Sequence, residues 1–204
     1  PAQTGQGPWH KARLGVAMAL LQGGNLEKTP ADQWVPKKMG IRASLYPVVK
    51  ELEDGWWKDP ERAAEIVKLF EHIVLNCDSA NNLAATALVT HAYLATGDQK
   101  YKQWVIDYTE AWMERIEQNG GIIPDNVGPT GKIGEHRDGV WWGGFYGWGH
   151  YQGFNIIYHA INIAAECCLL LTGDFKYLEL LRSQLNVLLD NSITREDGQL
   201  LVPR

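Results

Sequence analysis

The residue types best suited to chemistry gather in one stretch of this chain, residues 135–153, with the sequence EHRDGVWWGGFYGWGHYQG. Three Trp, two Tyr, two His, one Arg and two carboxylates share it with six glycines. Glycine lets the backbone turn freely and come close to a ligand. Flat aromatic faces beside charged and imidazole groups suit a sugar, whose C–H face stacks while its hydroxyls need hydrogen bonds. The stretch therefore predicts a sugar-binding loop; the alternative is that its rings only cap a hydrophobic core.

Carboxylates in and before this stretch point to acid–base catalysis. A glycosidase needs one protonated carboxyl group to assist the leaving group and one carboxylate to activate water or attack carbon. Asp138 is the first candidate, because Trp141 and Trp142 would shield it from water and favour its protonated form. Asp78 or Glu135 is the expected partner, unless the partner lies in the other half of the fold, outside this chain. Asp78 or Ser79 also suits an ordinary helix N-cap, which is the alternative explanation for this position.

A second chemistry fits the same stretch. A polysaccharide lyase removes the proton beside a uronate carboxylate, using a Tyr or His base and an Arg or Asn that neutralises the carboxylate. The residues that match these roles are Arg137, Tyr146, His150, Tyr151 and Asn82. For either chemistry, the expected substrate-binding residues are Trp141, Trp142, Trp148, Tyr151, His136 and Asn82.

Composition argues against several other classes of function. The chain has 204 residues, 45% hydrophobic and 21% charged, which fits one domain with a sizeable core. Its net charge of −5 and the absence of a Lys/Arg run argue against nucleic-acid binding. The longest apolar run, residues 156–172, is interrupted by polar side chains, so no membrane span is expected. No Cys or His pair has metal-ligand spacing, so we expect no metal and no cofactor; a loop Ca²⁺ site at Asp125 is the alternative.

An internal repeat predicts the elements that position these residues. The sequence TGDQKY at 96–101 returns as TGDFKY at 172–177, an offset of 172 − 96 = 76 residues. Each motif lies between two helical patterns, so it predicts a helix end at Gly and an N-cap at Asp, which together make a tight helical hairpin. NGGII at 119–123 resembles DGQLL at 197–201, and we expect each to follow the second helix of its hairpin.

The pattern predicts an all-α fold of alternating inner and outer helices, because strand signals are nearly absent. A third, earlier hairpin is expected from residues 41–52 and 61–76. The expected inner helices are 79–96 and 154–172, and the expected outer helices are 61–76, 98–118 and 174–192. The inner helices are apolar nearly all round, so we expect most of their faces to be buried.

With these motifs the chain resembles the six-hairpin (α/α) toroids, which include many glycoside hydrolases, polysaccharide lyases and sugar epimerases. The resemblance rests on the T-G-D-x-K-Y corner, on N-G-G-I-I-P-D at 119–125 and on an aromatic Gly-rich insertion at 120–153. It covers roughly residues 40–204. It implies that the loops at 76–82 and 122–155 line a cleft at one end of the helices.

The chain is expected to be one toroid domain over residues 1–204 and to hold about half of a ring. Three hairpins fill this chain, whereas six would need about 450 residues. Another chain, a second copy or sequence outside this chain would complete the ring. The first functional hypothesis is a glycoside hydrolase that acts on an oligo- or polysaccharide through paired carboxylates. The second is a lyase of uronate-containing glycans, and the third is a non-catalytic helical-repeat binding module.

Overall fold

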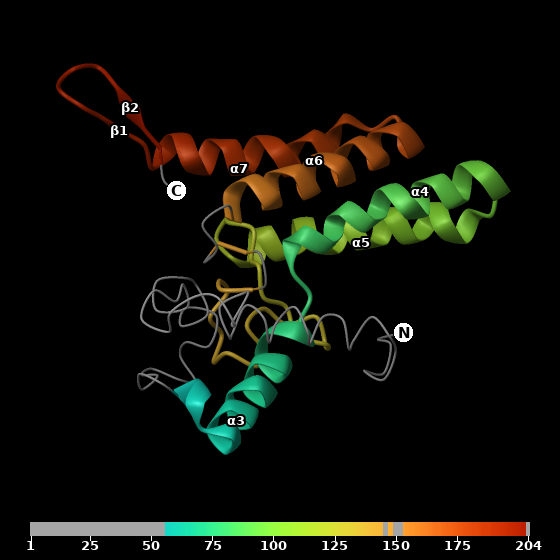
Figure 1. Ribbon diagram of the computed structural model, residues 1–204. Helices are drawn as coiled ribbons and strands as arrows, with labels where there is room; N and C mark the ends of the chain where they lie inside the picture. The colour runs from blue at the N-terminus through green and yellow to red at the C-terminus, as the bar shows by residue number, and fades with distance from the viewer. Residues whose placement is uncertain (1–55, 145–146, 149–152, 203–204) are drawn as a thin grey trace, which may run out of the picture.

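The computed structural model describes residues 56–144, 147–148 and 153–202, and these residues are mostly helical (Figure 1). Their five α-helices are α3 (Pro60–Phe70), α4 (Ala85–Thr96), α5 (Gln99–Gln118), α6 (Gly153–Thr172) and α7 (Glu179–Asp190). Shorter helical turns are η3 (Trp56–Lys58), η4 (Glu71–Leu75), η5 (Ala80–Ala84) and η6 (Phe175–Leu178). Strands β1 (Ile193–Thr194) and β2 (Leu200–Leu201) form a small antiparallel hairpin, with Ile193 opposite Leu201.

The two TGDxKY motifs form equivalent helix–helix corners, as the repeat predicts. In both, the Gly has a positive φ, 71° in the first and 73° in the second, which side chains rarely adopt. The Asp carboxylate accepts the backbone N–H of the Lys two residues later, at 3.1 Å and 2.9 Å. The Thr hydroxyl donates to the carbonyl four residues earlier, at 2.7 Å in each corner. The residues that do this are Thr96, Gly97 and Asp98, and then Thr172, Gly173 and Asp174.

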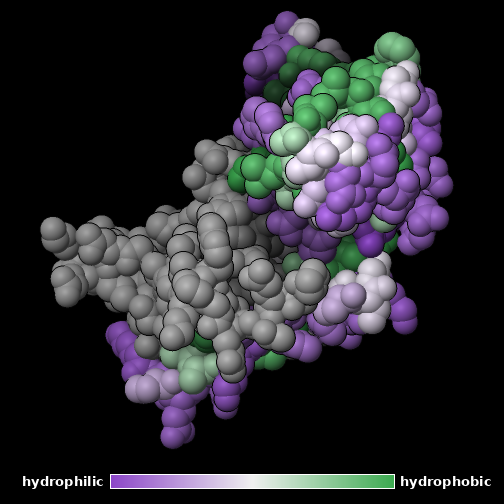
Figure 2. Space-filling view, turned by 90° about the vertical axis from the view of Figure 1, so that its right-hand side faces the viewer, coloured by the Kyte–Doolittle hydropathy of each residue, from purple (hydrophilic) through white to green (hydrophobic). Residues whose placement is uncertain are grey.

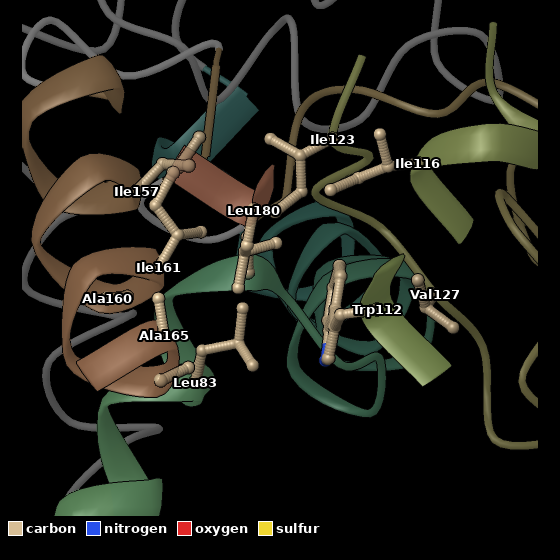
Figure 3. Close-up of a cluster of buried hydrophobic side chains, with 12 residues drawn as sticks. Leu83, Trp112, Ile116, Ile123, Val127, Ile157, Ala160, Ile161, Ala165 and Leu180 are labelled. Carbon is tan, nitrogen blue, oxygen red and sulfur yellow. The ribbon is translucent and has the colours of Figure 1, made fainter. Parts of the chain in front are cut away.

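The hairpins α4–α5 and α6–α7 stack on each other with their corners at the same end of the molecule (Figure 1). Apolar side chains fill the space between them and the loops at the other end (Figure 3). The fully buried members of this core include Leu83, Trp112, Ile161, Ala164 and Leu180. Helix α6 lies at its centre, since it packs against η5, α4, α5, η6 and α7. Apolar burial between the two hairpins therefore holds this part of the fold together.

Helix α6 also bears on the expectation that no segment spans a membrane. By length and composition alone it qualifies as a membrane-spanning helix, so its polar interruptions do not exclude a span. This is weak evidence, because the central helix of a packed domain meets the same criterion. Eight of its residues are buried against the neighbouring elements, which favours a core helix.

The second matched segment does not follow a helix directly, and this prediction was wrong. Helix α5 ends at Gln118, directly before the first match, but α7 ends at Asp190 and residues 197–201 lie in the β1–β2 hairpin. Asn119 and Asn191 occupy the two C-cap positions with similar φ values of −98° and −100°. The helix ends are thus 191 − 119 = 72 residues apart. The short strands that follow were not predicted.

Helix α4 corrects the expectation of two fully buried inner helices. Only Thr86 and Thr90 are buried along it, whereas Leu88 is 76% exposed and Leu94 is 61% exposed. Among the described elements, α4 packs on α5, α6 and η5, and these contacts leave Leu88 and Leu94 exposed. Residues 41–52, the first helix of the expected third hairpin, lie outside the described residues. The described residues form two stacked hairpins, and they show no closed toroid.

Candidate functional site

Two loops meet at the end of the hairpins opposite the corners. The backbone N–H of Asp78 donates to the carbonyl of Val127 at 2.7 Å, and the N–H of Val127 donates back to Asp78 at 2.9 Å. A further bridge joins Val127 to Ile133. These hydrogen bonds tie residues 76–82 to the start of the glycine-rich segment. The two loops that the resemblance places at one end of the helices therefore do lie side by side.

Asp78 is half-buried at this junction, and three groups orient its carboxylate. The Tyr108 hydroxyl donates to both carboxylate oxygens, at 2.9 Å and 3.1 Å, and Asn82 Nδ2 donates at 2.6 Å. The third donor is the backbone N–H of Ser79. Ser79, rather than Asp78, occupies the N-cap position of η5, so the ordinary cap explanation does not account for Asp78. Burial and the charge of Asp78 raise the pKa of Tyr108, so its hydroxyl stays a neutral donor.

Asp125 organises the glycine-rich segment from inside. Its side chain is fully buried, and its carboxylate accepts the backbone N–H groups of Gly144, at 2.7 Å, and Trp148. Burial raises the pKa of Asp125 to about 6, although these hydrogen bonds oppose the shift. A Cβ at Gly144 would lie 1.7 Å from the Asp125 carbonyl oxygen, and one at Gly147 would lie 2.0 Å from the carboxylate. The glycines let this segment wrap around Asp125.

The environment of Asp125 does not support the alternative of a Ca²⁺ site. A calcium ligand presents its oxygens to the cation. The oxygens of Asp125 face N–H donors instead. Within the part of the chain that the structure describes, no group of three or more His, Cys, Asp or Glu side chains is arranged to hold a metal ion.

Arg137 is fully buried beside Asp125, in a position that sequence reasoning did not assign to it. Its guanidinium carbon lies 5.5 Å from the ring centroid of Trp142. Burial lowers the pKa of Arg137, and the charge of Asp125 opposes that shift. A Cβ at Gly143 would lie 2.5 Å from the guanidinium, so this glycine too is fixed by packing. Arg137 therefore acts from inside the loop rather than on its surface.

The three residues around Arg137 in the sequence have separate environments. Glu135 accepts the backbone N–H of Thr130 at 3.0 Å, and this hydrogen bond holds the pKa of Glu135 below its usual value. The ring of His136 lies 4.2 Å from the ring of His72, between centroids. Asp138 is exposed, with a φ of 52°, in the turn that follows Gly134. Its exposure does not support the expectation that Trp side chains shield it from water.

The aromatic residues divide into core and surface groups. Trp148 packs against the main core, and its indole N–H donates to the Ile123 carbonyl at 2.8 Å. Its role is thus at least partly the structural one. Trp141 and Trp142 are half-buried and remain candidates for stacking on a sugar. Three other predicted site residues lie outside the described residues: Tyr146, His150 and Tyr151.

Comparison with known proteins gives a family but no activity. Residues 17–202 match the family described as Domain of unknown function (DUF8034). The chain belongs to this family. No curated protein and no solved structure matches it.

The junction brings four polar side chains of both loops into electrostatic reach of the Cys77 thiol. Cys77 is the link, because Asn126 and the charges of Glu135, Arg137 and Asp78 all influence the pKa of its thiol. Burial, followed by the charge of Glu135, raises the pKa of Cys77 to about 11, so the thiol stays protonated and unreactive. We call these residues the junction cluster: Cys77, Asp78, Asn126, Glu135 and Arg137. Its chemistry is that of oriented carboxylates, not of a nucleophilic cysteine.

Proposed function

We propose that this chain carries part of the active site of a glycoside hydrolase, and that the site lies at the junction cluster within an (α/α) toroid. One observation carries the proposal: Asp78 is half-buried where two loops meet and is oriented by Tyr108 and Asn82. Ligand sites are typically built on loops that a rigid scaffold positions. The stacked hairpins are such a scaffold here.

Asp78 takes over the role first considered for Asp138. A carboxylate that activates water or attacks carbon has to be held in place and partly shielded, and Asp78 meets both conditions. Glu135, whose pKa is lowered by the hydrogen bond from the Thr130 N–H, is a second carboxylate on the facing loop. A lowered pKa does not suit the acid of the pair, so the acid is unassigned. In this proposal, the proton for the leaving group comes from residues outside the junction cluster.

Trp142 supplies the stacking surface in this proposal. The ring is half-buried and backed by the Arg137 guanidinium, which fixes the ring by a cation–π contact. The backbone of Trp141 is also held in place, because its carbonyl accepts the N–H of the buried Asp125 at 2.9 Å. Rings held in this way lose little conformational entropy when a sugar stacks on them.

The lyase hypothesis is less favoured, for a specific reason. A lyase must place a cation against the uronate carboxylate of its substrate. Arg137 has 0% exposure and lies behind Trp142, where a substrate does not reach it. Tyr108, bound to Asp78 and with a raised pKa, is a poor base. Tyr146 and His150 lie outside the described residues, so the lyase role considered for them stays a prediction.

The test is a panel of polysaccharides, incubated with the full chain and followed by two signals. Reducing ends report cleavage of any glycosidic bond, and ultraviolet absorbance reports the unsaturated sugar that only a lyase makes. Reducing ends without the absorbance signal support the proposal. Both signals together, or no product from any glycan, overturn it in favour of a lyase or of a binding module.

A further inference from the structure

One face of the α4–α5 hairpin is exposed, whereas the equivalent face of the α6–α7 hairpin is buried. Ala164 and Leu180 lie in the core between the hairpins, with 0% and 1% exposure. The residues 76 positions earlier are Leu88, 76% exposed, and Trp104, 42% exposed. We call this side of α4–α5 the front face; its residues are Leu88, Ala92, Tyr101 and Trp104. Figure 2 views the molecule along the hairpins from their corner end and shows hydrophobic surface, in green, exposed among hydrophilic side chains.

The front face also repeats the polar part of the internal interface. Tyr177 is 2% exposed, and its hydroxyl donates to Glu110 of the facing hairpin at 2.9 Å. Lys176 pairs with the same carboxylate at 2.8 Å and lies over the Tyr177 ring, 4.9 Å from its centroid. Lys100 lies over the Tyr101 ring in the same way, at 4.8 Å, is exposed on α5 and pairs with Asp98 at 2.7 Å where Lys176 pairs with Glu110. The recognition pair that joins the two hairpins is therefore present a second time.

A complementary, partly exposed face lies on α7, and Leu181 at its edge also packs against the core. Val105 and Thr109 of α5 are fully buried, and Val105 packs against Cys168, Leu171 and Tyr177 of the facing hairpin. The residues 76 positions later are Leu181, which is half-buried, and Leu185, which is 39% exposed. Asn186 occupies the position equivalent to Glu110 and is exposed. Its side-chain amide oxygen can accept hydrogen bonds from Lys100 and Tyr101 of another copy. We call this the back face; its residues are Leu181, Leu185 and Asn186.

We propose that the front face of one copy of this chain docks on the back face of a second copy, head to tail. The contact would use the positions equivalent to those of the interface between α4–α5 and α6–α7, but between two copies of the chain. Helical repeats commonly propagate through such nearest-neighbour contacts. Both halves of the contact are on one chain, which makes a second copy the occupant. A head-to-tail contact is heterologous, so each copy uses one face of each kind.

The test measures self-association of the full chain by sedimentation velocity over a range of concentrations. Wild type associates, and Leu88→Glu or Leu185→Glu each weakens association by at least about tenfold, because each places a charge in an apolar contact. A mixture of these two variants forms a one-to-one complex that does not grow, because each partner retains one intact face. Leu94→Glu is the matched control: Leu94 and its counterpart Leu170 are both exposed, at 61% and 68%, so neither belongs to the interface.

Three results would overturn the inference. Wild type could stay monomeric at every concentration. Leu94→Glu could disrupt association as much as Leu88→Glu does. The mixture of Leu88→Glu and Leu185→Glu could fail to form the complex although each variant alone keeps the helical circular dichroism of wild type. None of these results bears on the glycan experiment, so this inference and the proposed function fail separately.

Discussion

The two ends of the helical hairpins use the same residue types in opposite ways. At the corner end, Asp98 is exposed and accepts an N–H two residues away. At the loop end, Asp125 is fully buried and accepts N–H groups 19 and 23 residues away. A local motif tolerates damage because water can replace its hydrogen bonds. A buried carboxylate that holds distant segments has no such substitute, so we expect the loop end to be the more sensitive of the two.

The largest effect is expected from Gly144→Ala. The new Cβ would lie 1.7 Å from the backbone carbonyl oxygen of Asp125, and backbone cannot rotate away as a side chain can. The free energy of unfolding should fall by about 3 kcal/mol or more, measured by urea denaturation. Gly139→Ala is the control, because Gly139 has a φ of 81° but nothing within 4 Å of its would-be Cβ. It should cost only about 1 kcal/mol. Equal losses would show that the loop does not close on Asp125.

The next effect concerns pH. Burial raises the pKa of Asp125 to about 6 from a usual 3.8, so the folded chain binds this proton more tightly than the unfolded chain. Stability from this group is therefore greatest at low pH and falls as pH rises from about 4 to 6, by about 3 kcal/mol in total. Asp125→Asn lacks the titration. The unfolding free energy of wild type minus that of the variant should therefore fall by this amount over the same pH range.

A difference between the two proteins that stays constant with pH would contradict a buried, ionisable Asp125. Comparing the two proteins at each pH removes the contribution of every group that they share.

Smaller effects are expected at the corners. Asp98→Ala and Asp174→Ala each remove one N-cap carboxylate from an exposed helix start, at a cost of about 1 kcal/mol. The two losses should be equal within error, because the motifs have the same cap geometry. Thermal unfolding of the two variants side by side measures this. Clearly unequal losses would mean that the corners are not equivalent.

The same contrast explains what the sequence could predict. The helices and both corners followed from caps, glycines and apolar spacing, all of which act within a few residues. The exposure of α4 did not, because it depends on which elements cover the helix in the folded chain. Asp125 was considered only as a calcium ligand, because its partners Gly144 and Trp148 are distant in the sequence. Its position directly after Ile122-Ile123-Pro124, opposite a glycine-rich segment, was the available signal of a buried carboxylate.

Two site residues show the same limit. Asp138 stands three residues before Trp141 in the sequence, but the turn at φ 52° leaves it exposed. Arg137, its neighbour, was considered as a substrate-binding cation and is instead buried against Trp142. Adjacent residues in a tight turn point in different directions, and their sequence spacing does not say which one faces inward.

The most direct test of the account compares Asp78→Asn with Asp138→Asn in the rate of reducing-end release from the glycan that wild type cleaves best. Both changes remove one carboxylate charge from the loop end, and both residues tolerate an amide sterically. The account predicts that Asp78→Asn lowers kcat by about 100-fold or more while its melting temperature stays close to that of wild type. Asp138→Asn should keep near-normal activity. Normal activity in Asp78→Asn, or loss of activity in Asp138→Asn instead, would contradict the assignment of the site to the junction cluster.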